Sequence, residues 1–249
     1  MATIESTNLL VVYELQLEAA RKRFADQLAV KTLFSEPMQA ASLEAFLIAF
    51  TILGVEMTQP VEGWIRRAGQ RCGELGLAHL ARALAAHAQQ EADHHLLMLA
   101  DAVHLVGRWN ARHRYQLNLE TLLQVQPTRG VRQYRALHED TICGSAPYGQ
   151  LAIEYEIEML SVTYGPKLIE RCSALLHPEI LDSLSFLREH VELDVGNTHF
   201  NRIQLNQLLM DNPAYVRPLV AAGSAALDAY AVFLGDCLSL LSEAADSCC

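Results

Sequence analysis

The sequence predicts an all-α protein, a single up-and-down bundle of about seven to eight helices. Apolar residues recur at three- and four-residue intervals through almost all of the 249 residues, and no stretch alternates as a strand would. Half of the residues, 51%, are hydrophobic, while glycine and proline are few, which is typical of a globular protein. Because the predicted helices are long and their connections short, we expect antiparallel neighbours in one domain covering residues 1–249.

The predicted helices follow one another between short breaks. The first covers about 4–33 and ends near Pro37, and the second covers about 38–57 and ends before Pro60. The third runs from the low 60s to Leu75, where Gly73 and Gly76 stop it. The others are expected over about 77–112, 118–125, 129–142, 147–175 and 178–210, with a last helix after Asn212–Pro213 to about 244 and a frayed tail over 245–249.

Composition excludes several classes of protein. A formal charge of −10 argues against binding to nucleic acid, which requires clustered Lys and Arg. The N-terminus lacks the pattern of a secretion signal, and the most apolar run, LIAFTILGV at 47–55, is too short to span a membrane. The six cysteines show no CxxC spacing, and Cys248–Cys249 does not form a prenylation signal. We therefore expect a soluble, cytoplasmic protein with buried free thiols.

Polar residues occupy one face of the predicted 77–112 helix. Glu91 and His94 form an ExxH pair, a spacing that lets two side chains of one helix reach a single metal ion. His87 and His95 lie in the same stripe by three- and four-residue spacing. Taken alone, the stripe is better explained as a solvated patch than as a metal site.

A second polar set lies in the predicted 147–175 helix, where Glu154, Glu156 and Glu158 alternate with apolar residues. Glu154 and Glu158 share one face, and Glu156 points elsewhere. Burial of an unpaired carboxylate is costly, so an inward glutamate needs a cation, a hydrogen-bond network or a proton. The structural alternative is a glutamate at the edge of the core, paired with Arg or Lys.

The third set is in the segment EHVELDVGNTH, residues 189–199. His190, Asp194 and Asn197 are spaced i, i+4 and i+7 and therefore share a helix face. Three long helices of one bundle would thus supply carboxylates and imidazoles together. Such a set suits non-haem iron or manganese, and several independent buried ion pairs would be a poor structural explanation.

These residues resemble the haem-oxygenase-like diiron oxidases and oxygenases. Family members carry an ExxH-type pair, then a Glu on a second helix, then HxxxDxxH on a third. The matching segments here are EADH at 91–94, Glu158 in EMLSVTYG at 158–165, and HVELDVGN at 190–197. The resemblance implies a haem-oxygenase-like fold, shared with TenA-like thiaminases and PQQ-synthesis protein C, both of which work without iron.

By this resemblance the expected ligands are Glu91, His94, Glu158, His190 and Asp194, with Glu154 as an alternate to Glu158. The resemblance implies two irons per chain, with manganese as another candidate. The last histidine of the family pattern is Asn197 here, a neutral and weaker donor, so one metal position should bind less tightly. His199 could replace it only if the helix were distorted, since two residues rotate the side chain by about 200°. His95 and His87 are other nearby candidates.

The resemblance further implies activation of dioxygen, with an electron donor, to oxidise a small molecule such as an amino acid, a fatty acid or a derivative in a biosynthetic pathway. Tyr155, Ser161, Tyr164 and Lys167 are candidates for the substrate pocket, and Lys167 or Arg202 for an anchor of a substrate carboxylate. A homodimer is a further candidate assembly. Two rival interpretations remain: a metal-free enzyme using Glu158 and His190 as acid and base, and a degenerate, non-enzymatic binding protein.

Overall fold

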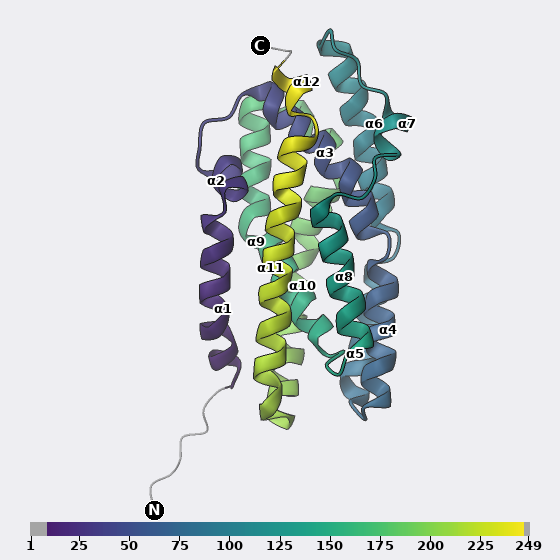
Figure 1. Ribbon diagram of the computed structural model, residues 1–249, viewed down its shortest axis with the longest axis vertical. Helices are drawn as coiled ribbons and strands as arrows, with labels where there is room; N and C mark the ends of the chain where they lie inside the picture. Colours follow the sequence, from purple (N-terminus) through teal and green to yellow (C-terminus); the bar gives the residue numbers. More distant parts are fainter. Residues whose placement is uncertain (1–8, 247–249) are drawn as a thin grey trace, which may run out of the picture.

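The computed structural model describes residues 9–246, and this part of the chain is entirely helical apart from its turns and loops. Figure 1 shows the long helices lying side by side along the longest axis of the molecule. The α-helices are α1 (Leu9–Asp26), α2 (Leu28–Phe34), α3 (Ala40–Thr58), α4 (Val61–Glu74), α5 (Ala78–Gln90), α6 (His94–Arg112), α7 (Leu119–Leu123), α8 (Arg129–Cys143), α9 (Gly149–Leu176), α10 (Ser185–Asp211), α11 (Val216–Leu240) and α12 (Ser242–Asp246). Two short 3-10 helices, η1 (Pro178–Ser183) and η2 (Pro213–Tyr215), precede α10 and α11.

The bundle is built around the last long helix. Helix α11 packs against α1, α3, α8 and α9, and Figure 1 shows it crossing the middle of the molecule. Helix α9 also packs along α10, and α3 packs along α6. These contacts bring α5, α6, α9 and α10 to the same region, although α5 and α10 are about a hundred residues apart in the sequence.

Helix α3 is the most thoroughly buried element near the centre. It is apolar on nearly all sides, and its residues from Leu43 to Gly54 are all buried, as expected for a helix without a solvent face. The stretches Ala40–Glu74 and Pro213–Leu240 are long and apolar enough to cross a membrane by length and composition alone, so the apolar run is longer than 47–55. Within the bundle, 72% of the most apolar window of the first stretch and 50% of that of the second are buried, which makes this weak evidence for a span.

The predicted helix over 77–112 is wrong in one important respect. The chain forms α5 and α6 instead, and a turn over residues 91–93 separates them. Asp93 adopts φ 65°, in the left-handed region, where a helix cannot continue. Glu91 and His94 therefore do not lie on one helix; they flank the break.

Three smaller differences concern helix ends. The predicted 4–33 helix is divided at Gln27, and its residues 4–8 lie outside the described part of the chain. The last helix is divided near Leu241, and Ala245, the first residue of the expected tail, is buried in α12, while residues 247–249 lie outside the described part of the chain. Cys72, Cys172 and Cys237 are buried free thiols and Cys143 is exposed, while Cys248–Cys249 lie outside the described residues.

Glu156 is the glutamate at the edge of the core that the structural alternative predicts. Its carboxylate is fully buried and accepts two hydrogen bonds from Arg21, at 2.9 and 2.7 Å, and one from the Tyr13 hydroxyl at 3.0 Å. Burial alone would lower the pKa of Arg21, but the hydrogen bonds and charges of Glu156 and Glu14 outweigh it and raise that pKa. The pair joins α1 to α9, and Glu156 points away from Glu154 and Glu158, as the helical spacing predicts.

Helices α8 and α11 approach closely at Gly130. A Cβ atom at this position would lie 2.4 Å from the Cα and N atoms of Phe233, which are backbone atoms and cannot rotate away. The Gly130 amide also donates to the Asp236 carboxylate at 2.6 Å. The contact therefore requires glycine.

We expect Gly130→Ala to destabilise the fold by about 1–3 kcal/mol, the usual cost of overpacking, because α8 must move away from α11. Gly107→Ala in α6 is the matched control, since nothing lies within 4 Å of its added Cβ. The control should be neutral or stabilising by up to about 1 kcal/mol. Urea unfolding of both variants measures the difference, and equal free energies of unfolding would contradict the close-approach explanation.

Candidate metal centre

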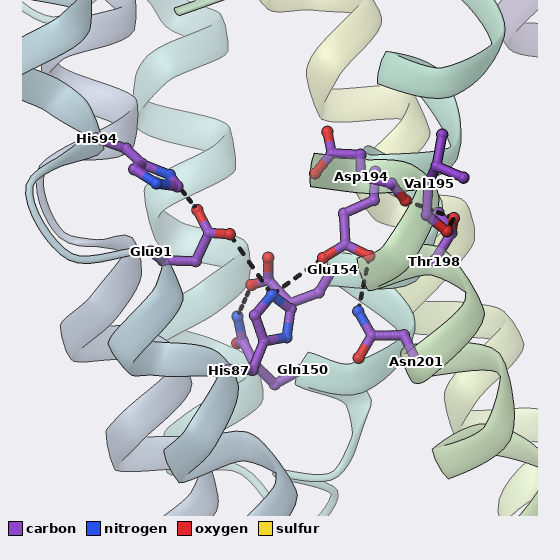
Figure 2. A network of polar contacts seen from close by, with 10 residues as sticks. His87, Glu91, His94, Gln150, Glu154, Asp194, Val195, Thr198 and Asn201 are labelled. Carbon is purple, nitrogen blue, oxygen red and sulfur yellow. Dashed lines mark hydrogen bonds and ion pairs between the residues drawn. The ribbon is translucent and has the colours of Figure 1, made fainter. Parts of the chain in front are cut away.

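Glu91 lies at the centre of a cluster of buried ligand groups. It stands at the end of α5, in the turn before α6, and its two carboxylate oxygens face different histidines. Oε2 lies 3.0 Å from Nδ1 of His94, and Oε1 lies 3.6 Å from Nε2 of His87 (Figure 2). One carboxylate thus contacts imidazoles on both sides of the helix break.

Two groups of three residues share Glu91. The outer triad is Glu91, His94 and His190, and the inner triad is His87, Glu91 and Glu158. Within each triad one potential ligand atom per residue lies within 4.8 Å of the others. Ligand atoms about 2.1 Å from one metal ion lie roughly 3–4 Å apart, so small side-chain rotations would complete either site.

His190 presents a free nitrogen to the outer triad. Its Nδ1 lies 2.9 Å from the backbone carbonyl of Phe186, one turn earlier in α10. A carbonyl only accepts, so Nδ1 carries the proton and Nε2 keeps its lone pair, the arrangement common to metal-binding histidines. Its ring packs on Phe186 at 3.8 Å and meets the His94 ring edge to face at 4.6 Å, which fixes its orientation.

The inner triad contains unsatisfied polar atoms. The side chain of His87 is 1% exposed, and neither of its ring nitrogens has a hydrogen-bond partner among the described residues. Its Nε2 lies 3.0 Å from Oε1 of Glu158, but the two atoms are not aligned for a hydrogen bond, and Oε1 is also unsatisfied. Buried polar atoms without partners are rare and costly. A cation held among these nitrogen and oxygen donors would satisfy them, and the donor set suits iron or manganese.

The charges of this cluster depend on one another. Burial alone would lower the pKa of His87, but the carboxylates of Glu158 and Glu91 outweigh it and raise that pKa to about 11. Burial would raise the pKa of Glu91, yet His87 and His94 hold it well below its usual range. Without a metal, therefore, an imidazolium neutralises the buried carboxylate. A metal ion would take the place of that proton.

Two acids from neighbouring helices complete the cluster, Glu158 of the inner triad on α9 and Asp194 on α10. Asn201 donates to Oε2 of Glu158 at 2.7 Å and helps to fix the position of this carboxylate. Burial raises the pKa of Glu158, and burial together with the charge of Glu158 raises the pKa of Asp194 to about 8. Nearby Ser161 and Asn197 offset part of the rise in the pKa of Asp194. Asp194 therefore faces Glu158 across the interface between α9 and α10.

Glu154, one turn before Glu158 on α9, begins a row of buried, hydrogen-bonded side chains that continues to Gln150 and His138. Gln150 donates to its carboxylate at 2.5 Å, and the same amide nitrogen lies 2.8 Å from Nδ1 of His138. Burial raises the pKa of Glu154 to about 8. His138 is fully buried, stacks on Trp64 at 4.1 Å, and has its pKa lowered by burial to about 4. It is therefore neutral at physiological pH.

The remaining predicted ligands lie elsewhere. Asn197 is half-buried and belongs to neither triad. His199 is exposed, as its rotation from position 197 predicts, and α10 shows no distortion that would turn it inward. His95 is half-buried and also outside both triads. The third histidine of the cluster is thus His87, which the sequence offers only as another nearby candidate.

A cavity of about 150 Å³ adjoins the cluster. Glu91, Glu154, Glu158, His190 and Asp194 all line it, together with many aromatic and aliphatic side chains. Two of the predicted pocket residues, Ser161 and Tyr164, also line it.

The other two predicted pocket residues do not line the cavity. The Tyr155 side chain points to α1, where its hydroxyl donates to Glu14 at 2.8 Å. Lys167 is exposed, with its ammonium group 5.1 Å from the centre of the Tyr164 ring. Neither side chain is therefore placed to bind a substrate in this cavity.

Asp101 on α6 sets the position of α10. Its carboxylate accepts hydrogen bonds from the Ser185 amide and hydroxyl at 2.9 and 2.7 Å and from the Phe186 amide at 2.9 Å. These donors are the first residues of α10, where a negative charge is favourable. The contact holds the start of α10 against α6 and thereby brings His190 to His94.

Comparisons with known proteins show the fold. A solved structure described as a domain of unknown function with a haem oxygenase-like fold, from Shewanella denitrificans, superposes with a TM-score of 0.71. The match covers 98% of this chain and 97% of the other, at 16% identity. No protein-family model and no curated protein matches the sequence. The all-α, haem oxygenase-like fold predicted from the sequence is therefore confirmed.

His138 should make stability depend on pH. A histidine whose pKa is about 6.5 when unfolded and about 4 when folded takes up a proton more readily in the unfolded chain. Its contribution is present above pH 6.5 and is lost as the pH falls toward 4, by up to about 3 kcal/mol. His138→Gln should reduce this fall in the free energy of unfolding, measured by urea unfolding between pH 7 and 4. The exposed His79→Gln is the control, and an unchanged pH dependence in His138→Gln would contradict the prediction.

Proposed function

We propose that the protein is a non-haem diiron enzyme that activates dioxygen to oxidise a small molecule. The observation that carries the proposal is the position of Glu91, which is shared by two triads and has one oxygen directed to each. A carboxylate in this position can bridge two metal ions. The resemblance of EADH at 91–94, Glu158 and HVELD at 190–194 to the diiron oxidases and oxygenases supports iron.

In this proposal each triad holds one iron. Glu91, His94 and His190 would hold the outer iron, and His87, Glu91 and Glu158 the inner one, with Asp194 beside Glu158 as a further carboxylate ligand. Bound iron would supply the electrons that begin the reduction of dioxygen. His87 thus takes the place that Asn197 leaves empty in the family pattern.

The protein side chains have separate tasks around the irons. Asn201 orients Glu158, the Phe186 carbonyl orients His190, and Asp101 holds α10 in place. Glu154, whose pKa is raised to about 8, can hold a proton beside the cavity. The apolar walls of the cavity exclude water from the substrate.

The overall reaction needs an electron donor. Transfer of one oxygen atom to a substrate C–H bond, with release of the other as water, takes two electrons from the substrate and two from a donor, together with two protons. We therefore propose an external reductant as a partner, in the reducing cytoplasm that the free cysteines favour.

Anaerobic titration with Fe(II) tests the proposal. We expect two irons per chain at saturation, counted by a colorimetric chelator after removal of free metal, and oxygen consumption when the loaded protein is exposed to air. Binding of less than one iron per chain would refute the dinuclear site. Stable, iron-free protein that retained activity in chelator would favour the metal-free alternative.

Three variants test which residue completes the second site. His87→Ala should lower the iron content to about one per chain, or weaken the second iron at least about tenfold, because the inner triad loses its only imidazole. His94→Ala should weaken the outer iron by a similar factor. Asn197→Ala should keep both irons, since Asn197 lies outside both triads.

Thermal melting of the iron-free variants serves as the control for folding. Loss of the second iron in Asn197→Ala with retention in His87→Ala would reverse the assignment. A large gain in iron affinity in Asn197→His would also count against His87, since it would show that the second site was incomplete.

A further inference from the structure

Trp64 on α4 lies at the centre of a small group of stacked rings. Its side chain is buried, and its indole ring stacks on the imidazole of His138, with the ring centres 4.1 Å apart and 7° between the planes. The ring of Tyr134 meets both edge to face, with its centre 6.2 Å from that of Trp64 and 4.6 Å from that of His138. These three rings from α4 and α8 form one continuous contact.

Both partners of Trp64 lead inward to the metal centre. Tyr134 lines the cavity, as do carboxylates of the proposed iron ligands. His138 lies 2.8 Å from the Gln150 amide nitrogen, which donates at 2.5 Å to Glu154, another residue of the cavity wall. Electron tunnelling weakens steeply with distance and is faster through packed and hydrogen-bonded atoms than across a gap. These contacts therefore couple the indole of Trp64 to the centre.

The nitrogen of the same indole is directed to the surface. Its Nε1–H donates to Oε1 of Glu139 at 2.9 Å, and Glu139 forms an ion pair with Arg67 at 2.7 Å. These two side chains are 46% and 44% exposed, so a reductant in solution can approach within one residue of the buried ring. Arg67 holds the pKa of Glu139 below its usual value, which keeps the carboxylate ionised.

A carboxylate acceptor favours the loss of an electron from the indole. A buried indole N–H needs a hydrogen-bond partner, but a neutral carbonyl would meet that need. Trp109, the other tryptophan of the chain, donates to the carbonyl oxygen of Tyr115 at 2.8 Å. At Trp64 the negative charge of Glu139 stabilises a positive charge on the ring, because hydrogen bonds to ionised groups strengthen with charge. Trp64 is therefore the more easily oxidised of the two.

We infer that Trp64 is an electron relay, which gives one electron to the metal centre when dioxygen has been activated and no substrate is bound. This inference rests on the proposed diiron function. One electron passes from the indole to the oxidised centre and leaves a tryptophan radical cation. No bond forms or breaks, and the proton stays on Nε1 beside the Glu139 carboxylate. An external one-electron donor then returns an electron to the ring, so the centre is reduced without oxidation of the cavity wall.

A photo-oxidant at the surface tests the relay without enzyme turnover. Cys143 is exposed and lies one turn after Glu139 on α8, so a ruthenium complex attached to it stands beside Trp64. The labelled protein carries Cys248→Ser and Cys249→Ser, which confine the label to one site. A laser flash with a soluble electron acceptor oxidises the complex, and transient absorbance follows the tryptophan radical that forms next.

The two tryptophans provide a matched pair of variants. In metal-free protein, Trp64→Phe should abolish the fast formation of the tryptophan radical, and Trp109→Phe should leave it unchanged. Trp109 is a suitable control because it lies about 22 Å along α6 from His94, at 1.5 Å per residue. Thermal melting of both variants separates loss of the radical from loss of the fold.

Bound metal tests the inner half of the relay in protein that keeps Trp64. After anaerobic loading and counting of iron, an electron from Fe(II) should reduce the Trp64 radical, so the radical should decay faster than in metal-free protein. Zn(II)-loaded protein is the control, because zinc fills the site but has no redox chemistry. Its radical should live as long as that of metal-free protein.

Two results would overturn the relay. One is equal radical formation in Trp64→Phe and Trp109→Phe, and the other is an equal radical lifetime in iron-loaded and zinc-loaded protein. If two irons bind and oxygen is consumed while these lifetimes are equal, the relay fails and the diiron proposal stands. If no iron binds, both fail.

Discussion

The free-energy cost of burying carboxylates determines which side chains surround them at the centre of this protein. Glu91, Glu154, Glu158 and Asp194 converge in the interior of a helical bundle, where a single unpaired carboxylate would be strongly unfavourable. Three of them have specific polar partners: His87 and His94 lie beside Glu91, Gln150 donates to Glu154, and Asn201 donates to Glu158. The compensation is incomplete, since both nitrogens of His87 and one oxygen of Glu158 lack hydrogen bonds. Buried groups so poorly satisfied are expected at functional sites rather than in a structural core.

The backbone is arranged to bring these groups together. The turn over residues 91–93, with Asp93 in the left-handed region, lets Glu91 reach imidazoles on two different helices. If α5 continued without a break, His94 would follow Glu91 on one helix and α6 would take another direction. On the opposite side, Asp101 fixes the first turn of α10 against α6. The helix break and this capping contact are both local, and together they determine the distance between His94 and His190.

Most of the fold could be predicted from the sequence because apolar periodicity and proline or glycine breaks determine helix positions. The break between α5 and α6 could not, since Glu91, Ala92 and Asp93 continue the helical pattern and only the packing of α6 against α3 and α10 favours the turn. The polar cluster on three segments was predicted from spacing, and the structure brings Glu91, His94 and His190 together as one triad. His87 belongs to the inner triad, whereas the family pattern places the last histidine at position 197, where this sequence has Asn197. Tyr155 and Lys167 were placed at the pocket because position along a helix does not reveal which neighbouring helix covers each face.

In the proposed centre, the last histidine ligand comes from α5, as His87, and not from position 197 on α10. A histidine at position 197 would approach from α10, the helix that also carries His190 and Asp194, so three ligands would move together with α10. His87 approaches instead from α5, which is packed along α4 on the far side of the cluster. Both α5 and α10 then hold an imidazole, and Glu91 links the two from the turn between α5 and α6. Movement of α10 would consequently disturb the outer triad through His190 while the imidazole of the inner triad stays on α5. In the proposed diiron centre, the outer triad therefore depends on the position of α10, whereas the imidazole of the inner triad does not.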